Sequence, residues 1–179
     1  MGGDSSAGDR GGRRGFSRAA GTIALFALLA SLSVAGCGAS GHGAETDPEK
    51  GADAAVLNTA LTRELTLRHF YAQGRPYMSG RWRAQRRHLL AEEGEYVDGI
   101  TKAIRGLGGQ SEGEAEEVDL SGVSGRRGFL ALATELETEA REFYVAKAAQ
   151  LNTAAPRTLD AWLAAGHGMH LGILPAGGG

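Results

Sequence analysis

The chain has 179 residues, a length typical of one domain, and 42% of them are hydrophobic, which is enough for a single core. Its formal net charge of -2 gives no overall basic surface, so nucleic acid is not expected among its partners. The one cysteine, Cys37, excludes an intramolecular disulfide framework.

The N-terminal segment has the pattern of an export signal. Arginines at positions 10, 13, 14 and 18 precede an uncharged stretch, residues 19–36, with an apolar centre. A basic region followed by a short apolar one is typical of a secretory signal, so residues 1–36 are predicted to be removed. The arginine pair fits either a twin-arginine export motif or an ordinary basic region.

The end of this segment, Val34-Ala35-Gly36-Cys37, resembles the lipobox of bacterial lipoproteins. In that family the cysteine is lipidated and the signal is cut before it. The resemblance implies lipidation of Cys37 and an anchor at the extracytoplasmic face of a bacterial cell membrane. Residues 37–51 then form the lipidated cysteine and a flexible tether, because they contain almost nothing to bury, and residues 175–179 form a flexible tail.

Residues 52–174 are predicted to form an all-α four-helix bundle. Apolar residues recur with a spacing near 3.6 over residues 53–73, 81–107, 129–151 and 156–174, and no convincing alternating strand pattern occurs. A long connection, residues 108–128, joins the second and third segments, and a crossover along the bundle needs such a length. Its acidic residues are expected to be solvated rather than to bind cations.

Each predicted helix places titratable groups on its apolar face when its residues are set at about 100° intervals. These groups are Glu64, Glu93, Glu137, His167 and His170. A buried carboxylate needs a partner, and carboxylates facing imidazoles suit iron, manganese or zinc. On the second helix, Tyr96 lies at the edge of the apolar stripe, whereas Glu92 and Glu95 point away from it.

A second solution needs no metal. Arg68 and Arg86 also fall on the inward arcs, and Arg68 follows Glu64 by one helical turn, so an ion pair could neutralise that glutamate. The periodicity alone does not decide between a metal site and a polar core network. The glycines at 166, 168 and 172 likewise suit either close helix packing or room around a metal.

Three segments resemble the helices of ferritin-like domain proteins that occur as exported bacterial lipoproteins. The first runs from Asp53 to Glu64 and on to Phe70-Tyr71, the second from Leu90 to Asp98 and on to Gly109, and the third from Phe129 to Glu137. The resemblance covers most of residues 53–174 and implies a ferritin-like four-helix bundle with a long crossover between helices 2 and 3.

Di-iron members of that superfamily place one glutamate on each of two helices and a Glu-x-x-His pair on each of the others. Glu64 and Glu137 match the single glutamates. Glu93 matches the glutamate of the second helix, but Tyr96 takes its histidine position, and a phenol with a pKa near 10 is a poor ligand. On the fourth helix His167 replaces the glutamate and His170 matches the histidine.

These departures argue against a conventional carboxylate-bridged di-iron oxidase. A single-metal site of Glu64, Glu137 and His170, with Glu93 or His167, is the better fit. The sequence therefore predicts a membrane-anchored extracytoplasmic ferritin-like lipoprotein that binds iron, manganese or zinc for sequestration or oxidation. The alternative is a metal-free bundle that acts as a structural or interaction module of the cell envelope.

Overall fold

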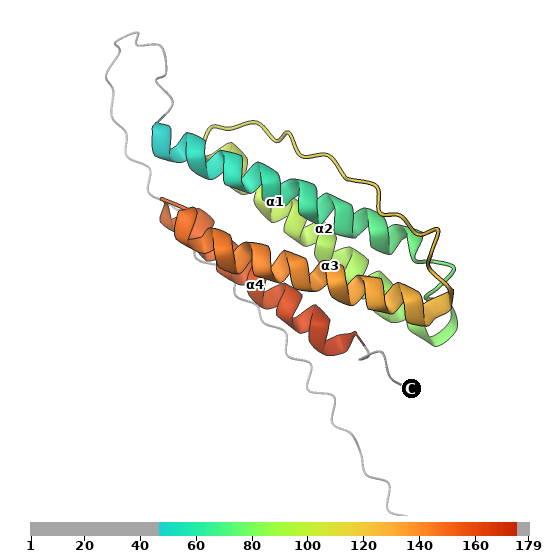
Figure 1. The fold of residues 1–179 in the computed structure, drawn as a ribbon. Helices are drawn as coiled ribbons and strands as arrows, with labels where there is room; N and C mark the ends of the chain where they lie inside the picture. Colours follow the sequence, from blue (N-terminus) through green and yellow to red (C-terminus); the bar gives the residue numbers. More distant parts are fainter. Residues whose placement is uncertain (1–46, 175–179) are drawn as a thin grey trace, which may run out of the picture. The chain divides into compact units, whose positions relative to one another are not determined.

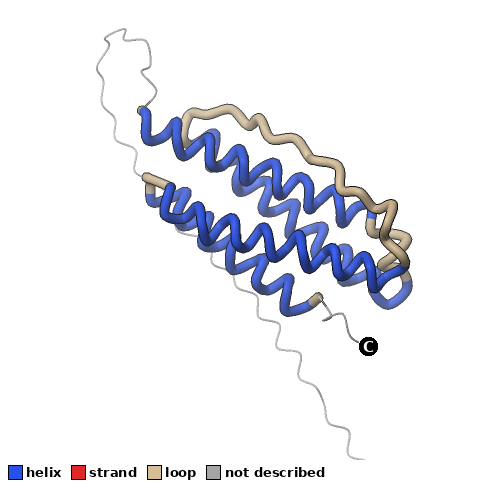
Figure 2. The backbone as a smooth tube through the Cα atoms, in the orientation of Figure 1, coloured by secondary structure: helices blue, strands red, loops and turns tan. Residues whose placement is uncertain are grey.

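The computed structural model describes residues 47–174, which lie in one compact unit. The predicted signal at 1–36, the lipidation site Cys37, most of the tether and the tail at 175–179 lie outside these residues. The described part contains α-helices and short 3-10 helices and no strand (Figure 2). Its elements are α1 (Pro48–Gln73), η1 (Gly80–Trp82), α2 (Arg83–Gly106), α3 (Gly125–Lys147), η2 (Ala148–Gln150) and α4 (Ala154–Ile173).

The helices form two hairpins joined by a long crossover (Figure 1). A short turn returns the chain from α1 to α2, and a second short connection returns it from α3 to α4. Between the hairpins the chain runs back along the outside of α1, so that α3 begins near the end of α1. The predicted four-helix bundle with a crossover between the second and third helices is confirmed.

Helix α1 begins at Pro48, ahead of the start predicted at Asp53. The side chain of Asp47 accepts a hydrogen bond from the backbone N–H of Glu49 at 3.1 Å, and proline suits the first helical turn. Residues 48–51, which were expected in the tether, are therefore helical. Apolar spacing missed them because this first turn has no core to face.

The crossover is held against α1 by side chains of that helix. Asn58 Nδ2 donates to the carbonyl of Gln110 at 3.0 Å, and Asn58 Oδ1 accepts from the N–H of Glu112 at 2.9 Å. Further along, Thr66 Oγ1 accepts from the N–H of Glu116 at 2.9 Å. The acidic side chains of the segment are exposed, as predicted, while its backbone follows the helix.

Two hydrophobic clusters divide the interior. One contains Phe70 and Phe129, whose rings stack at 4.3 Å, and the other contains Leu57, Ile100 and Leu163. Along α1, α2 and α4, four buried polar residues lie between members of the two clusters: Glu64, Glu93, His167 and His170. Because both clusters come from within the bundle, it has the core of an independently folding domain.

Asp53 ties the start of α1 to the connection between α3 and α4. Its Oδ1 accepts from the N–H of Asn152 at 2.7 Å and its Oδ2 from the N–H of Thr153 at 2.9 Å. The side chains of Asn152 and Thr153 donate to the same two oxygens. Burial opposes ionisation, but these hydrogen bonds outweigh it and lower the pKa of Asp53. We call this contact the Asp53 clamp.

Candidate metal centre

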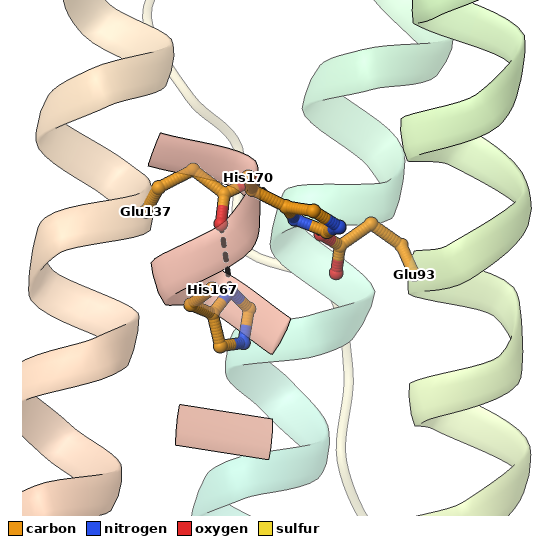
Figure 3. Close-up of side chains that lie close together, drawn as sticks. All are labelled: Glu93, Glu137, His167 and His170. Carbon is orange, nitrogen blue, oxygen red and sulfur yellow. Dashed lines mark hydrogen bonds and ion pairs between the residues drawn. The ribbon is translucent and has the colours of Figure 1, made fainter. Parts of the chain in front are cut away.

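All five residues predicted from the helical faces lie in one buried layer between the hydrophobic clusters. Every side chain in this set is buried: Glu64, Glu93, Glu137, His167 and His170. They come from all four helices, and four of them converge in Figure 3. We call the five residues the polar layer.

His167 bridges two carboxylates from different helices. Its Nδ1 lies 2.7 Å from Glu137 Oε2 on α3, and its Nε2 lies 3.1 Å from Glu64 Oε1 on α1. The pKa values of Glu64 and Glu137 are both lowered, so their ionised oxygens only accept and both ring nitrogens carry a proton. These contacts make His167 an imidazolium, in keeping with its raised pKa.

His170 connects the polar layer to a third carboxylate. Its Nδ1 lies 3.0 Å from Glu137 Oε1 and 3.3 Å from Glu93 Oε1. Its Nε2 lies 3.0 Å from Glu92 Oε2. The prediction that Glu92 points away is wrong: a glutamate side chain at the margin of a helix face is long enough to reach inward. His170 is thus also doubly hydrogen-bonded to carboxylates.

The pKa values follow from these contacts. Burial would raise the pKa of Glu137, but the hydrogen bonds from His167 and His170 outweigh it and lower the pKa to about 2. Burial would lower the pKa of His167, but its hydrogen bonds to Glu137 and Glu64 raise it to about 10. The same balance, with Glu137 as the main partner, raises the pKa of His170.

Glu64 and Glu93 form a pair in which one carboxyl keeps its proton. Burial, and after it the charge of Glu64, raises the pKa of Glu93 well above its ordinary value. Burial opposes the ionisation of Glu64 too, but its contacts with His167 lower its pKa. The polar layer therefore holds two imidazolium ions, two carboxylates and one neutral carboxyl, and it is electrically neutral.

Two buried tyrosines that the helical periodicity did not assign to the site also take part in the layer. Tyr71 donates to Glu137 Oε1 at 2.6 Å, and Tyr144 donates to Glu64 Oε1. For each tyrosine, burial and then the neighbouring carboxylate raise the pKa well above its ordinary value, so both remain donors. A signal was present, because each follows the glutamate of its own helix by the same seven residues.

Tyr96 lies beside the imidazoles. Its ring stacks on His170 at 5.7 Å and meets Trp162 edge-on at 4.8 Å. Burial raises the pKa of Tyr96, so the phenol stays neutral, which disfavours it as a metal ligand. Its hydroxyl occupies the space where Gly166 lacks a side chain. Close packing is therefore the reason for the glycine at 166.

The two arginines do not neutralise the carboxylates. Arg68 is exposed, in a groove that Leu65 and Gly94 also line. Arg86 donates from Nη1 to the carbonyl of Tyr71 at 3.2 Å. The arginine ion pair considered from the sequence is wrong, since His167 and His170 are the cations of the polar network. A flexible arginine near a helix margin can turn its charge away from the core.

Comparisons with known proteins identify the family of the helical bundle. The family model described as ferritin-like domain matches residues 52–176. The fold is similar to a solved structure of ferritin-like, diiron-carboxylate proteins from Bacillus anthracis str. Ames, with a TM-score of 0.61 and 19% identity over 72% of this chain and 96% of that one. At that identity the likeness shows the fold alone.

A search of the curated proteins finds no match. Among the described helices, none combines the length and the apolar character that crossing a membrane requires.

Proposed function

Since the chain belongs to the ferritin-like domain family, we propose that it is a membrane-anchored, extracytoplasmic lipoprotein that binds a transition metal ion in the polar layer. The ion is iron, manganese or zinc, held for sequestration or for oxidation. The anchor is lipidated Cys37, in keeping with the lipobox-like residues 34–37.

The observation that carries the metal proposal is a set of buried oxygens that lack a neighbouring donor. Glu64 Oε2 and both carboxyl oxygens of Glu93 are buried and find no donor apart from the proton that Glu93 itself keeps. Glu93, Glu137, His167 and His170 each offer a ligand atom, and these atoms all lie within 4.8 Å of one another. Buried polar atoms normally have partners, so the donor set fits a metal ion.

The described residues would hold the ion as follows. Glu93 and Glu137 supply oxygens and His167 and His170 supply nitrogens, a mixed set suited to borderline divalent ions. Tyr71 holds the orientation of Glu137 through its hydrogen bond, as outer partners of metal ligands commonly do. Bound iron or manganese would supply one-electron chemistry, whereas zinc would not.

The ligand pattern supports a site other than a conventional di-iron oxidase. The resemblance implies histidine at position 96 and glutamate at position 167, whereas the chain has tyrosine at 96 and histidine at 167. Glu93, without a histidine one turn later, faces His170 instead. This arrangement favours one ion bound chiefly to α3 and α4.

The alternative function is a metal-free bundle that serves as a structural or interaction module of the envelope. The direct contacts of His167 with Glu137 and Glu64 favour it, because they make the layer neutral without an ion.

Metal analysis of residues 38–179 tests the proposal. The purified chain is stripped with chelator, incubated with Fe²⁺, Mn²⁺ or Zn²⁺, desalted and assayed for bound metal. We expect stoichiometric metal that Glu137→Gln and His170→Ala abolish and that His69→Ala, at an exposed histidine, retains. A wild-type chain that retains no metal would leave the metal-free alternative.

Proton release separates specific binding from surface binding. Coordination by His167 and His170 displaces a ring proton from each, and coordination by Glu93 displaces its carboxyl proton, so about three protons should leave when an ion binds. Calorimetric titrations in buffers of different ionisation enthalpy measure that number. Binding without proton release would place the ion elsewhere.

Membrane fractionation tests the anchor. The full chain with Cys37→Ser should leave the membrane fraction and become soluble, while the unaltered chain stays with the membrane. A Cys37→Ser chain that still fractionates fully with membranes would contradict lipidation as the anchor.

A further inference from the structure

The polar layer reaches solvent through one of its hydrogen-bond partners. Tyr71 and Tyr144 are fully buried, whereas the side chain of Glu92 is 26% exposed. Glu92 contacts His170, whose side chain is only 1% exposed. Of these three hydrogen-bond partners of the layer, Glu92 is thus the one that also faces water.

An exposed histidine contacts Glu92 on the side that faces water. His88 lies one helical turn before Glu92 on α2, its Nε2 is 3.1 Å from Glu92 Oε2, and its side chain is 57% exposed. The same Glu92 oxygen lies 3.0 Å from His170 Nε2. One carboxylate oxygen therefore joins an imidazole at the surface to an imidazole in the core.

We infer that His88, Glu92 and His170 form a loading site, at which a divalent transition metal ion is bound at the surface before it enters the polar layer. Two imidazoles and one carboxylate are a ligand set used for ferrous iron, and they suit manganese and zinc as well. This inference rests on the proposed function, because a loading site needs a buried site to fill.

The orientation of His170 supports the transfer. Its Nδ1 faces Glu137 and Glu93 inside the layer, and its Nε2 faces Glu92 at the edge. One ring therefore offers a ligand atom on each side of the boundary. An ion that exchanges its water ligands stepwise for Glu92 and His88 avoids the cost of entering the core as a bare charge.

Loading kinetics test the inference. Apo residues 38–179 are mixed with Co²⁺ in a stopped-flow instrument, and binding is followed by quenching of intrinsic fluorescence. We expect His88→Ala and Glu92→Gln to slow loading by about tenfold or more, the low end of what loss of a metal-site partner costs. The amount of Co²⁺ retained after desalting should equal that of the wild type, because the buried ligands are intact.

Two matched controls change exposed residues outside the loading site, one on α1 and one on α2. His69→Ala removes another exposed histidine, and Glu95→Gln neutralises another exposed glutamate of α2. Both should load at the wild-type rate. All four variants change side chains that are exposed or at the margin, and thermal unfolding checks that each remains folded.

The outcomes separate this inference from the proposed function. His88→Ala loading as fast as the wild type, with full Co²⁺ retained, would overturn the loading site and leave the buried site standing. If only Glu92→Gln had an effect, Glu92 would merely orient His170, and the loading site would also be overturned. A wild-type chain that retains no Co²⁺ or other metal would overturn both.

Discussion

Helices α1 and α3, the first helices of the two hairpins, contribute equivalent groups to the polar layer. Helices α2 and α4, the second helices, contribute different groups. On α1, Tyr71 follows Glu64 by seven residues, and on α3, Tyr144 follows Glu137 by the same interval. Each tyrosine donates to the glutamate of the opposite helix. These crossed pairs make α1 and α3 chemically equivalent.

Helices α2 and α4 differ at the matching positions. Where α2 has Glu93 and Tyr96, α4 has His167 and His170, again with a spacing of three residues. The α2 groups are neutral in the fold because their pKa values are raised, whereas the α4 groups are cations. Helices α1 and α3 thus supply the negative charge of the polar layer, and α4 alone supplies the positive charge that balances it.

Removal of a cation from α4 should break this balance most severely. We expect His167→Ala to lower the free energy of unfolding by about 3 to 5 kcal/mol, because Glu64 and Glu137 lose a buried partner. Urea denaturation of the apo chain measures the loss, and His69→Ala should change it by less than about 0.5 kcal/mol. A loss below about 1 kcal/mol for His167→Ala would contradict the charge assignment.

Removal of either crossed donor should have a moderate and similar effect. We expect Tyr71→Phe and Tyr144→Phe each to cost about 1.5 to 3 kcal/mol, the range for hydrogen bonds to charged groups. The same denaturation experiment measures both. If the two losses in unfolding free energy differed by more than about 1.5 kcal/mol, the width of that range, α1 and α3 would not be energetically equivalent.

The fit of α2 against α4 can be tested at one glycine. A methyl group at Gly166 would overlap the Tyr96 hydroxyl, so Gly166→Ala should cost about 1 to 3 kcal/mol. Addition of Tyr96→Phe should recover part of the loss. Gly172→Ala is the matched control on α4, because nothing lies within 4 Å of its added carbon, and it should stabilise by about 0.5 to 1 kcal/mol. Equal effects at both glycines would contradict the packing described.

The pH dependence of stability should sharpen the contrast between acid and base groups. The pKa of His167 is raised from 6.5 to about 10, so its stabilisation is complete below pH 6.5 and is lost as the pH rises to 10. The pKa of Glu137 is lowered from 4.5 to about 2, so its stabilisation is present above pH 4.5 and is lost toward pH 2.

Denaturation of the apo chain between pH 6.5 and 10 measures the first effect. The slope is about 1.4 kcal/mol per pH unit for each proton involved, and His167→Gln should reduce it by one proton. A slope that His167→Gln leaves unchanged would show that other groups produce the alkaline loss.

Most of the fold and most of the site residues could be predicted from the helical spacing of the apolar residues. Glu64, Glu93 and Glu137 were placed inward by angle alone, and rigid backbone geometry makes that angle reliable. The partners of those residues were harder to predict. Glu92 reaches inward from the margin, and Arg68 turns outward from an inward arc, because long side chains choose their direction after the backbone is set.

The features that periodicity did not predict depend on specific contacts in the folded chain. The seven-residue spacing from a glutamate marks Tyr71 and Tyr144, but their partners depend on hydrogen bonds between residues 66 and 80 positions apart in the chain, which that local pattern does not identify. The start of α1 depends on the cap formed by Asp47 and not on apolar spacing. Sequence periodicity thus located the polar layer, and the structure was needed to show what neutralises it.

The Asp53 clamp has a consequence for the order of folding. Helices α1 and α2 pack mainly on each other, as do α3 and α4, so each hairpin can form from contacts close in sequence. The clamp joins residues 53 and 152–153, which meet only when the hairpins dock. Glu64 and Glu93 belong to the first hairpin, and His167 and His170 to the second. The polar layer is therefore complete only when the hairpins dock, and either hairpin alone offers a metal ion no complete set of ligands.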